Sequence, residues 1–250
     1  MQKKRFKLIA CEILFREVCH CASLCAPVID VTFMRKGLHD VGETLMKKTL
    51  QDEIDKTDAE KYDAVLLGYG LCNNGVRGLR ANLPLVIPKA HDCITLLLGS
   101  RERYSDYFYS NPGTYYESSG WLERGLDADR NDGSIFNQLG GLSTSADYAE
   151  LYGEENAEYL AEILGNMLNN YKKVTYINTG LGAVEADRET ARENAGAKGF
   201  EFEEIQGDIG LIYRLLGGDW DESEFLVVPP GCEVCPSNDS GVLCCKCCEK

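Results

Sequence analysis

Residues 61–72 read KYDAVLLGYGLC, and this stretch indicates the class of fold. After three polar residues, an almost unbroken apolar run covers residues 64–69, which is typical of a strand buried on both faces of a sheet. Residues 85–90 (LVIPKA) form a second run of this kind. Because such strands occur in parallel sheets that are covered by helices, the sequence favours an α/β fold.

Strand and helix patterns alternate on both sides of this stretch. We expect further strands at residues 6–14 and 28–34, and helices at residues 41–56 and 93–107. From residue 146 onward, helices and strands are expected in strict alternation over residues 146–172, 174–178, 183–197, 200–205, 210–216 and 225–229. These patterns predict an α/β protein with two Rossmann-like halves, residues 1–110 and 146–230, whose mostly parallel sheets face a cleft.

Two segments interrupt this alternation. Residues 111–145 are rich in Gly, Asp, Asn and Ser, and we interpret them as an irregular insertion that covers the site. An ordinary helical connection is the alternative. Residues 231–250 form a Cys-rich tail with almost nothing apolar to bury. We therefore expect two halves, an insertion and a tail.

The composition restricts the class of protein. The chain has 250 residues and a formal net charge of −14, which argues against nucleic acid as a partner because phosphate backbones are bound by an excess of Lys and Arg. No apolar run approaches the roughly 18–20 residues that span a bilayer, and the N-terminus lacks a signal-peptide pattern. We expect a cytoplasmic protein without a membrane partner, whose twelve cysteines serve metal, cluster or thiolate chemistry rather than disulfides.

Cysteine and histidine residues directly follow the expected strands. Cys11 closes the first strand, Cys72 follows the third, and His91 and Cys93 follow the fourth. In a parallel sheet the carboxyl ends of the strands share one edge, and ligands bind there. Since thiolate and imidazole are suitable ligands for Zn²⁺ and Fe²⁺, these four residues predict a Zn or Fe site. The alternative is that the cysteines pack in the core, as buried cysteines usually do.

Three acid–base residues accompany this predicted site. Glu12 follows Cys11, and His39 lies after the second strand, so either residue is a candidate for moving a proton. Asp92, between His91 and Cys93, would orient an imidazole or accept a proton, as carboxylates beside metal ligands do. Glu12, His39 and Asp92 are thus the predicted catalytic residues.

The C-terminal tail carries the strongest local metal pattern. A Cys-x₂-Cys pair is followed by clustered cysteines, as in zinc knuckles and iron–sulfur sites, and the predicted ligands are Cys232, Cys235, Cys244 and Cys247. Metal binding can supply the folding energy that a short polar segment lacks. The alternative is a disordered tail that scavenges or delivers metal. A second group, Cys19, His20, Cys21 and Cys25, matches no standard ligand spacing, and free thiols in a loop are the alternative there.

A further set of residues predicts anion binding. Gly180 and Gly182 lie between an expected strand and helix, as in turns that hold phosphate, but the third glycine of such motifs is missing. Four arginines follow the site-bearing strands and are candidates to hold an anionic ligand: Arg77, Arg80, Arg101 and Arg103. A plain turn and surface arginines are the alternatives.

Several longer motifs resemble one family. They are KGLHD at residues 36–40, GYGLCNNG at 68–75, LVIPKAHDCI at 85–94, GSRERY at 99–104 and GTYY at 113–116. Over roughly residues 6–230 the chain resembles the family catalogued as domain of unknown function 1638. The resemblance implies similarity to proteins of methanogens and anaerobic bacteria that are often encoded beside corrinoid-dependent methyltransferases, and hence a role in one-carbon metabolism. The chain departs from that pattern at Cys232, where relatives tend to have a histidine.

Three functional hypotheses follow. The first is a Zn or Fe protein with a Cys/His site in the cleft, acting as catalyst or accessory in corrinoid-linked methyl transfer. In it, corrinoid enters only through a partner, which is a corrinoid protein or a methyltransferase. The second is an iron–sulfur or metal carrier that docks on a methyltransferase system and uses the tail. The third is a metal-free binder of an anionic small molecule.

Overall fold

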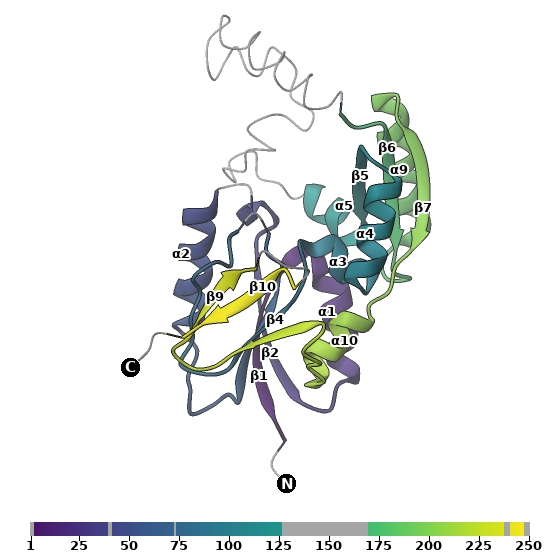
Figure 1. Ribbon diagram of the computed structural model, residues 1–250. Helices are drawn as coiled ribbons and strands as arrows, with labels where there is room; N and C mark the ends of the chain where they lie inside the picture. Colours follow the sequence, from purple (N-terminus) through teal and green to yellow (C-terminus); the bar gives the residue numbers. More distant parts are fainter. Residues whose placement is uncertain (1–2, 40–41, 73, 127–169, 238–240, 248–250) are drawn as a thin grey trace, which may run out of the picture.

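This computed structural model describes residues 3–39, 42–72, 74–126, 170–237 and 241–247 (Figure 1). The predicted helix at residues 146–172 and most of the predicted insertion therefore lie outside the described residues. The part of the insertion that is described is regular, because it forms strand β5 (Thr114–Ser118) and helix α5 (Ser119–Leu126). This corrects the expectation that residues 111–126 are irregular.

The main sheet has the strand order β2-β1-β3-β4-β8 within the described residues. Its first four strands are parallel neighbours, as the buried apolar runs predict, and β8 pairs antiparallel with β4. The strands are β1 (Arg5–Cys11), β2 (Val28–Met34), β3 (Ala64–Gly68), β4 (Leu85–Pro88) and β8 (Phe225–Val228). Every residue of β3 and β4 is buried, which explains the absence of alternation in their sequences.

A second sheet is formed by β5, β6 (Lys173–Asn178) and β7 (Glu201–Gln206), which are parallel. Helix α9 (Val184–Lys198) packs on β6 and β7. In Figure 1 these elements lie on the right of the molecule, beside the main sheet. The chain is therefore a mixed α/β protein with mostly parallel sheets. Residues 225–228 belong to the main sheet, whereas the sequence pattern assigned them to the second half.

Helices cover the main sheet and its C-terminal edge. They are α1 (Phe15–Leu24), α2 (Glu43–Ile54), α3 (Cys93–Leu98), α4 (Arg101–Ser110) and α10 (Gly210–Gly217), with short 3₁₀ turns η1 (Glu12–Leu14) and η2 (Lys36–His39). Helix α2 buries Met46, Leu50 and Ile54, which share one face because they are four residues apart. None of the helices in the described part of the chain has the length and apolarity that a membrane span requires.

Helix α1 and the end of β1 differ from the sequence-based expectation. The predicted strand at residues 6–14 ends at Cys11, and Ile13 and Leu14 are buried in η1 instead. Residues 15–24 form α1, so Cys19 and Cys21 are helical rather than in a loop. Cys19 is exposed and Cys21 is buried, so they face opposite environments.

The C-terminal segment is a hairpin of β9 (Glu233–Pro236) and β10 (Leu243–Lys246) that packs on the main core. Its residues Val234 and Leu243 are 0% and 2% exposed, which corrects the expectation that the tail has almost nothing to bury. Backbone hydrogen bonds join Val234 to Gly78 and Leu79. A disulfide links Cys232 to Cys247, which corrects the expectation that the cysteines avoid disulfides.

Candidate functional site

Three cysteines meet at the C-terminal edge of the main sheet. Cys11 is the last residue of β1, and Cys93 is the first residue of α3, which follows β4. Cys72 follows β3, and its N–H donates to the carbonyl of His91 at 2.9 Å, which holds the Cys72 segment beside the start of α3. Cys72 has a φ of +42°, a left-handed conformation that costs a non-glycine residue about 1–2 kcal/mol. Such strain is typical of functional sites.

Burial controls the protonation of these thiols. It is the main reason that the pKa of Cys11 is raised to about 12, and it also raises the pKa of Cys72 and Cys93. The Asp92 carboxylate, and after it Cys72 and Cys11, raise the pKa of Cys93 further. At neutral pH all three are therefore protonated, and protonated thiols are weak nucleophiles.

Tyr69 lies within this thiol cluster, which we define as Cys11, Cys72 and Cys93. The side chain is 3% exposed, and burial followed by the neighbouring charges of the three cysteines raises its pKa. Its hydroxyl interacts with the Cys11 thiol, but no described residue offers it a hydrogen bond of normal geometry. Because an unpaired buried hydroxyl costs about 1–3 kcal/mol, the hydroxyl indicates a missing partner. Tyr69 was not among the predicted site residues, although its position directly after β3 places it at the same edge.

A charged pair flanks Cys11. Glu12 Oε1 accepts a hydrogen bond from the Lys36 backbone N–H at 2.8 Å, so the ends of β1 and β2 are tied together. The Glu12 carboxylate raises the pKa of Cys11, and the Lys36 ammonium lowers it. Lys36 Nζ also lies 4.8 Å from the centre of the Trp121 ring, which belongs to α5. Glu12 therefore lies beside the thiol cluster, as the sequence predicts.

Asp92 and His91 were both predicted to belong to the Cys/His site, and the structure gives each of them different surroundings. Asp92 caps α3, with Oδ1 accepting from the N–H groups of Ile94 and Thr95, at 3.0 and 3.4 Å, and Oδ2 accepting from the Tyr104 hydroxyl at 2.8 Å. Burial is the main cause that raises the pKa of Asp92. His91 is exposed, so the structure does not bring it into the buried cluster. The side chain of His39 lies outside the described residues.

The thiol cluster is not a closed coordination site in the described conformation. Among the residues with described positions, no three Cys, His, Asp or Glu side chains are arranged to hold a metal ion. Metal binding by the cluster would therefore require cysteine side chains to move between staggered rotamers.

The four tail cysteines do not converge. Cys232 and Cys247 form the disulfide, and Cys235 lies opposite Cys244 in the ladder of β9 and β10. Because neighbouring residues of a strand point to opposite faces, residues three apart also do so. The two pairs therefore face opposite sides of the hairpin, and this ladder does not offer four sulfurs to one ion.

The predicted anion-binding residues have structural contacts. Gly180 and Gly182 have φ values of +76° and +100° in the turn between β6 and α9. Arg101 donates to the carbonyl of Ser223 at 3.0 Å. Arg103 donates to the carbonyls of Leu98 and Gln206, which links α4 to the end of β7. Both arginines thus hold main-chain segments together, and the structure does not place them at the glycine turn.

A buried carboxylate joins α1 to this turn. Glu17 is 1% exposed, its Oε1 accepts from the Thr179 hydroxyl at 2.7 Å, and its Oε2 has no hydrogen-bond partner among the described residues. Burial raises the pKa of Glu17, and the bond from Thr179 opposes this shift. This contact is not predictable from sequence, because nothing in residues 15–24 indicates which segment lies opposite α1.

Because Glu17 is buried, the effect of Glu17→Gln on the free energy of unfolding should depend on pH. A carboxyl with a raised pKa in the folded protein stabilises the fold below its unfolded value, near 4.5, and loses that contribution as the pH rises through the folded pKa. The free energy of unfolding of Glu17→Gln relative to wild type should therefore increase by on the order of 1 kcal/mol from acid to neutral pH. Denaturant unfolding at both pH values measures this. A difference that does not change with pH would contradict the burial of the charge.

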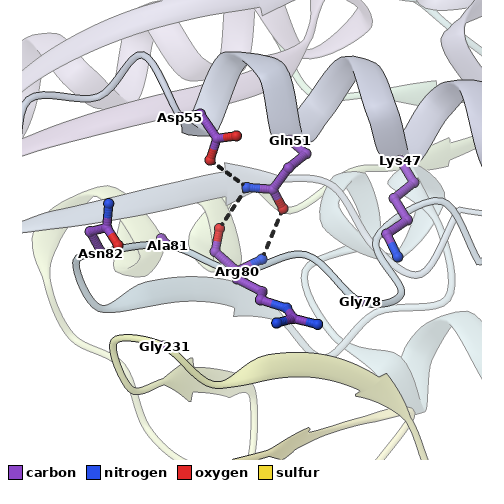
Figure 2. Close-up of a pocket in the computed structure, with 8 residues that line it drawn as sticks. All are labelled: Lys47, Gln51, Asp55, Gly78, Arg80, Ala81, Asn82 and Gly231. Atoms are coloured by element: carbon purple, nitrogen blue, oxygen red, sulfur yellow. Dashed lines mark hydrogen bonds between the residues drawn. The ribbon is translucent and has the colours of Figure 1, made fainter.

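A separate polar pocket of about 500 Å³ lies between α2, residues 78–82 and Gly231 (Figure 2). Gln51 forms one wall, and its amide bonds both the N–H and the carbonyl of Arg80 as well as the Asp55 carboxylate. The tips of Lys47 and Arg80 extend toward Gly78 in this view. Arg80, one of the four arginines predicted as candidates to hold an anion, lines this pocket.

The fold and the site define an α/β protein with mostly parallel sheets and a largely buried thiol cluster at the strand ends. The chain belongs to the family described as Protein of unknown function (DUF1638), whose model matches residues 33–216. This match confirms the resemblance and covers Cys72 and Cys93, but not Cys11 or the C-terminal hairpin. No curated protein and no solved structure matches the chain with significance.

Proposed function

We propose that the protein binds Zn or Fe through Cys11, Cys72 and Cys93 and acts in corrinoid-linked one-carbon metabolism. The observation that carries the proposal is the placement of three thiols, with Cys11 buried and Cys72 and Cys93 half-buried, around the Tyr69 hydroxyl, which has only a poorly oriented contact with Cys11. If the cysteines served only to pack the core, the buried Tyr69 hydroxyl would have no function there. A ligand bound to the sulfurs would give this hydroxyl a hydrogen-bond partner. With three protein ligands, the fourth position would stay open for a substrate or for the exposed His91.

The raised pKa values of the thiols support a cation as the ligand. Burial makes an isolated thiolate unfavourable here, and a divalent cation supplies the opposite charge that the low-dielectric site lacks. When bound, the metal would supply Lewis-acid activation of a substrate or thiol. Lys36 and Glu12 flank Cys11, so Glu12 is placed to accept a proton that leaves this thiol.

The placement of the site between two halves of the molecule is part of this proposal. Gly120 of α5 lies against Ile13, and Lys36 Nζ donates to the carbonyl of Trp121 at 3.5 Å. These contacts join the ends of β1 and β2 to the end of β5, which favours a site in a cleft between Rossmann-like halves. The methyl-transfer role and a corrinoid protein or methyltransferase as partner rest on the family resemblance.

The first test is metal binding by variants of the cluster. We expect reduced, anaerobically prepared protein to bind one Zn²⁺ or Fe²⁺ per chain, and Cys72→Ser or Cys93→Ser to weaken binding at least about tenfold. Cys21→Ala is the matched control, because burial raises the pKa of Cys21 to about 12 as well, yet the residue lies on α1. All proteins should carry Cys244→Ser and Cys247→Ser, since truncation of the hairpin would remove the buried Val234 and Leu243.

The pH dependence of binding provides a second readout. Because the thiols are protonated near neutral pH, the metal must displace protons, and its apparent affinity should rise up to about tenfold per pH unit for each proton released. Competition titrations with a chromophoric chelator at about pH 6 and about pH 8 measure this. The proposal would be wrong if Cys72→Ser and Cys93→Ser kept full metal occupancy, or if binding showed no dependence on pH.

A further inference from the structure

A second cysteine pair faces across the C-terminal hairpin. The register of β9 and β10 places Cys235 directly opposite Cys244. Residues opposite each other in an antiparallel ladder have Cα atoms about 4.5–5.5 Å apart, which lies within the range of about 4.4–6.8 Å that a disulfide requires. The same hairpin already carries the Cys232–Cys247 disulfide. Its backbone is therefore compatible with cross-strand sulfur bonds.

The hairpin holds this pair in place and presents it to solvent. Strand β9 is fixed by backbone hydrogen bonds between Val234 and residues 78–79, and by the Arg80–Glu233 ion pair at 2.8 Å. Cys244 is exposed and Cys235 is half-buried. An external disulfide can thus reach Cys244, and Cys235 lies opposite it on the neighbouring strand. Cys244 is therefore placed as the attacking thiol and Cys235 as the resolving thiol.

We propose that Cys235 and Cys244 form a reversible thiol–disulfide exchange site that takes a low-molecular-weight or protein disulfide as its oxidant. The Cys244 thiolate attacks one sulfur of the oxidant, forms a mixed disulfide and releases one thiol. The Cys235 thiolate then attacks the Cys244 sulfur, closes the Cys235–Cys244 bond and releases the second thiol. The two cysteines lose two electrons and two protons, and the oxidant gains them as two thiols. This site is independent of the metal proposal, because it uses none of the cluster residues.

Cys245 provides a matched comparison. It is exposed like Cys244 and adjacent in sequence, but its partner in the ladder is the buried Val234. A disulfide that depends only on exposure would form equally well through Cys245. One that depends on the cross-strand geometry requires Cys244.

The test is disulfide mapping of the full chain after incubation with glutathione disulfide and glutathione at graded ratios. Alkylation traps the remaining thiols, and trypsin releases residues 215–246 still joined to residues 247–250 by the Cys232–Cys247 disulfide, so fragment-ion spectra of this linked peptide must assign which cysteines are alkylated. In wild type and in Cys245→Ser we expect this peptide to lose two hydrogens, and dithiothreitol to restore them. Cys235→Ser and Cys244→Ser should abolish the internal bond completely.

Mapping of wild type keeps the test decisive even if a variant does not fold. The proposal is overturned if Cys235 and Cys244 of wild type remain thiols at ratios that fully oxidise Cys232–Cys247. Retention of the internal bond in Cys244→Ser through Cys245, in a variant with an unchanged circular dichroism spectrum, would also overturn it.

Discussion

Replacement of Gly120 by Ala should lower the free energy of unfolding by about 3 kcal/mol or more, and Gly120→Val should prevent folding. A Cβ atom at Gly120 would lie 1.8 Å from the carbonyl oxygen of Ile13 and 2.7 Å from its carbonyl carbon. These are backbone atoms of η1, which cannot rotate away as a side chain can. Relief would require the second sheet to move away from the C-terminal edge of the main sheet.

Denaturant unfolding measures this effect, and α9 offers the control. Gly196 lies within α9, and a Cβ atom there would meet nothing within 4 Å. Gly196→Ala should therefore stabilise the protein by about 0.5–1 kcal/mol, as alanine does in a helix. If Gly120→Ala unfolded at the same denaturant concentration as wild type, the close approach of α5 to η1 would be refuted.

Replacement of Asp92 by Ala should be the second most damaging change, with a loss of about 1.5–5 kcal/mol in the free energy of unfolding. About 0.5–2 kcal/mol comes from the lost N-cap of α3. A further loss of about 1–3 kcal/mol comes from Tyr104, a half-buried residue whose hydroxyl would lose its hydrogen-bond acceptor. Since α3 begins with Cys93, fraying of this helix would also displace one member of the thiol cluster.

Asp92→Asn distinguishes the capping role from proton transfer. The asparagine oxygen can still accept from the N–H groups of Ile94 and Thr95, so the variant should lose less than about 1 kcal/mol in denaturant unfolding. Metal binding at the cluster should then also survive in Asp92→Asn and weaken in Asp92→Ala. If both substitutions lowered the free energy of unfolding equally, Asp92 would not stabilise the protein through the N-cap of α3.

The parallel strands of the main sheet were predictable from sequence because their burial is complete. Residues 64–68 and 85–88 are apolar on both faces, and no other element of this length gives that pattern next to turn residues. Their parallel order places Cys11, Cys72 and Cys93 at one edge, so three of the four predicted core ligands do lie together. Tyr69 was equally predictable by this reasoning, since it follows β3 directly.

Other predictions were wrong or incomplete where a short stretch of sequence is compatible with two different structures. The apolar run after Cys11 is compatible with a longer strand or with a buried turn, and Ile13 and Leu14 take the turn. Asp92 between His91 and Cys93 was predicted to orient an imidazole or accept a proton, and the structure shows in addition that it caps α3. The spacing of Cys232 and Cys235 suits a metal knuckle or a β-ladder, and β9 adopts the ladder.

The sequence by itself determined the α/β class, the buried parallel strands and the common edge that carries the thiols, because these features depend on the polarity of consecutive residues. Only the tertiary structure decided that β8 joins β4 antiparallel, that β5 extends the second sheet and that the hairpin packs on residues 78–79. It also decided that Glu17 meets Thr179. These contacts join segments far apart in the chain, and a segment's own pattern shows that it must be buried but does not specify its partner.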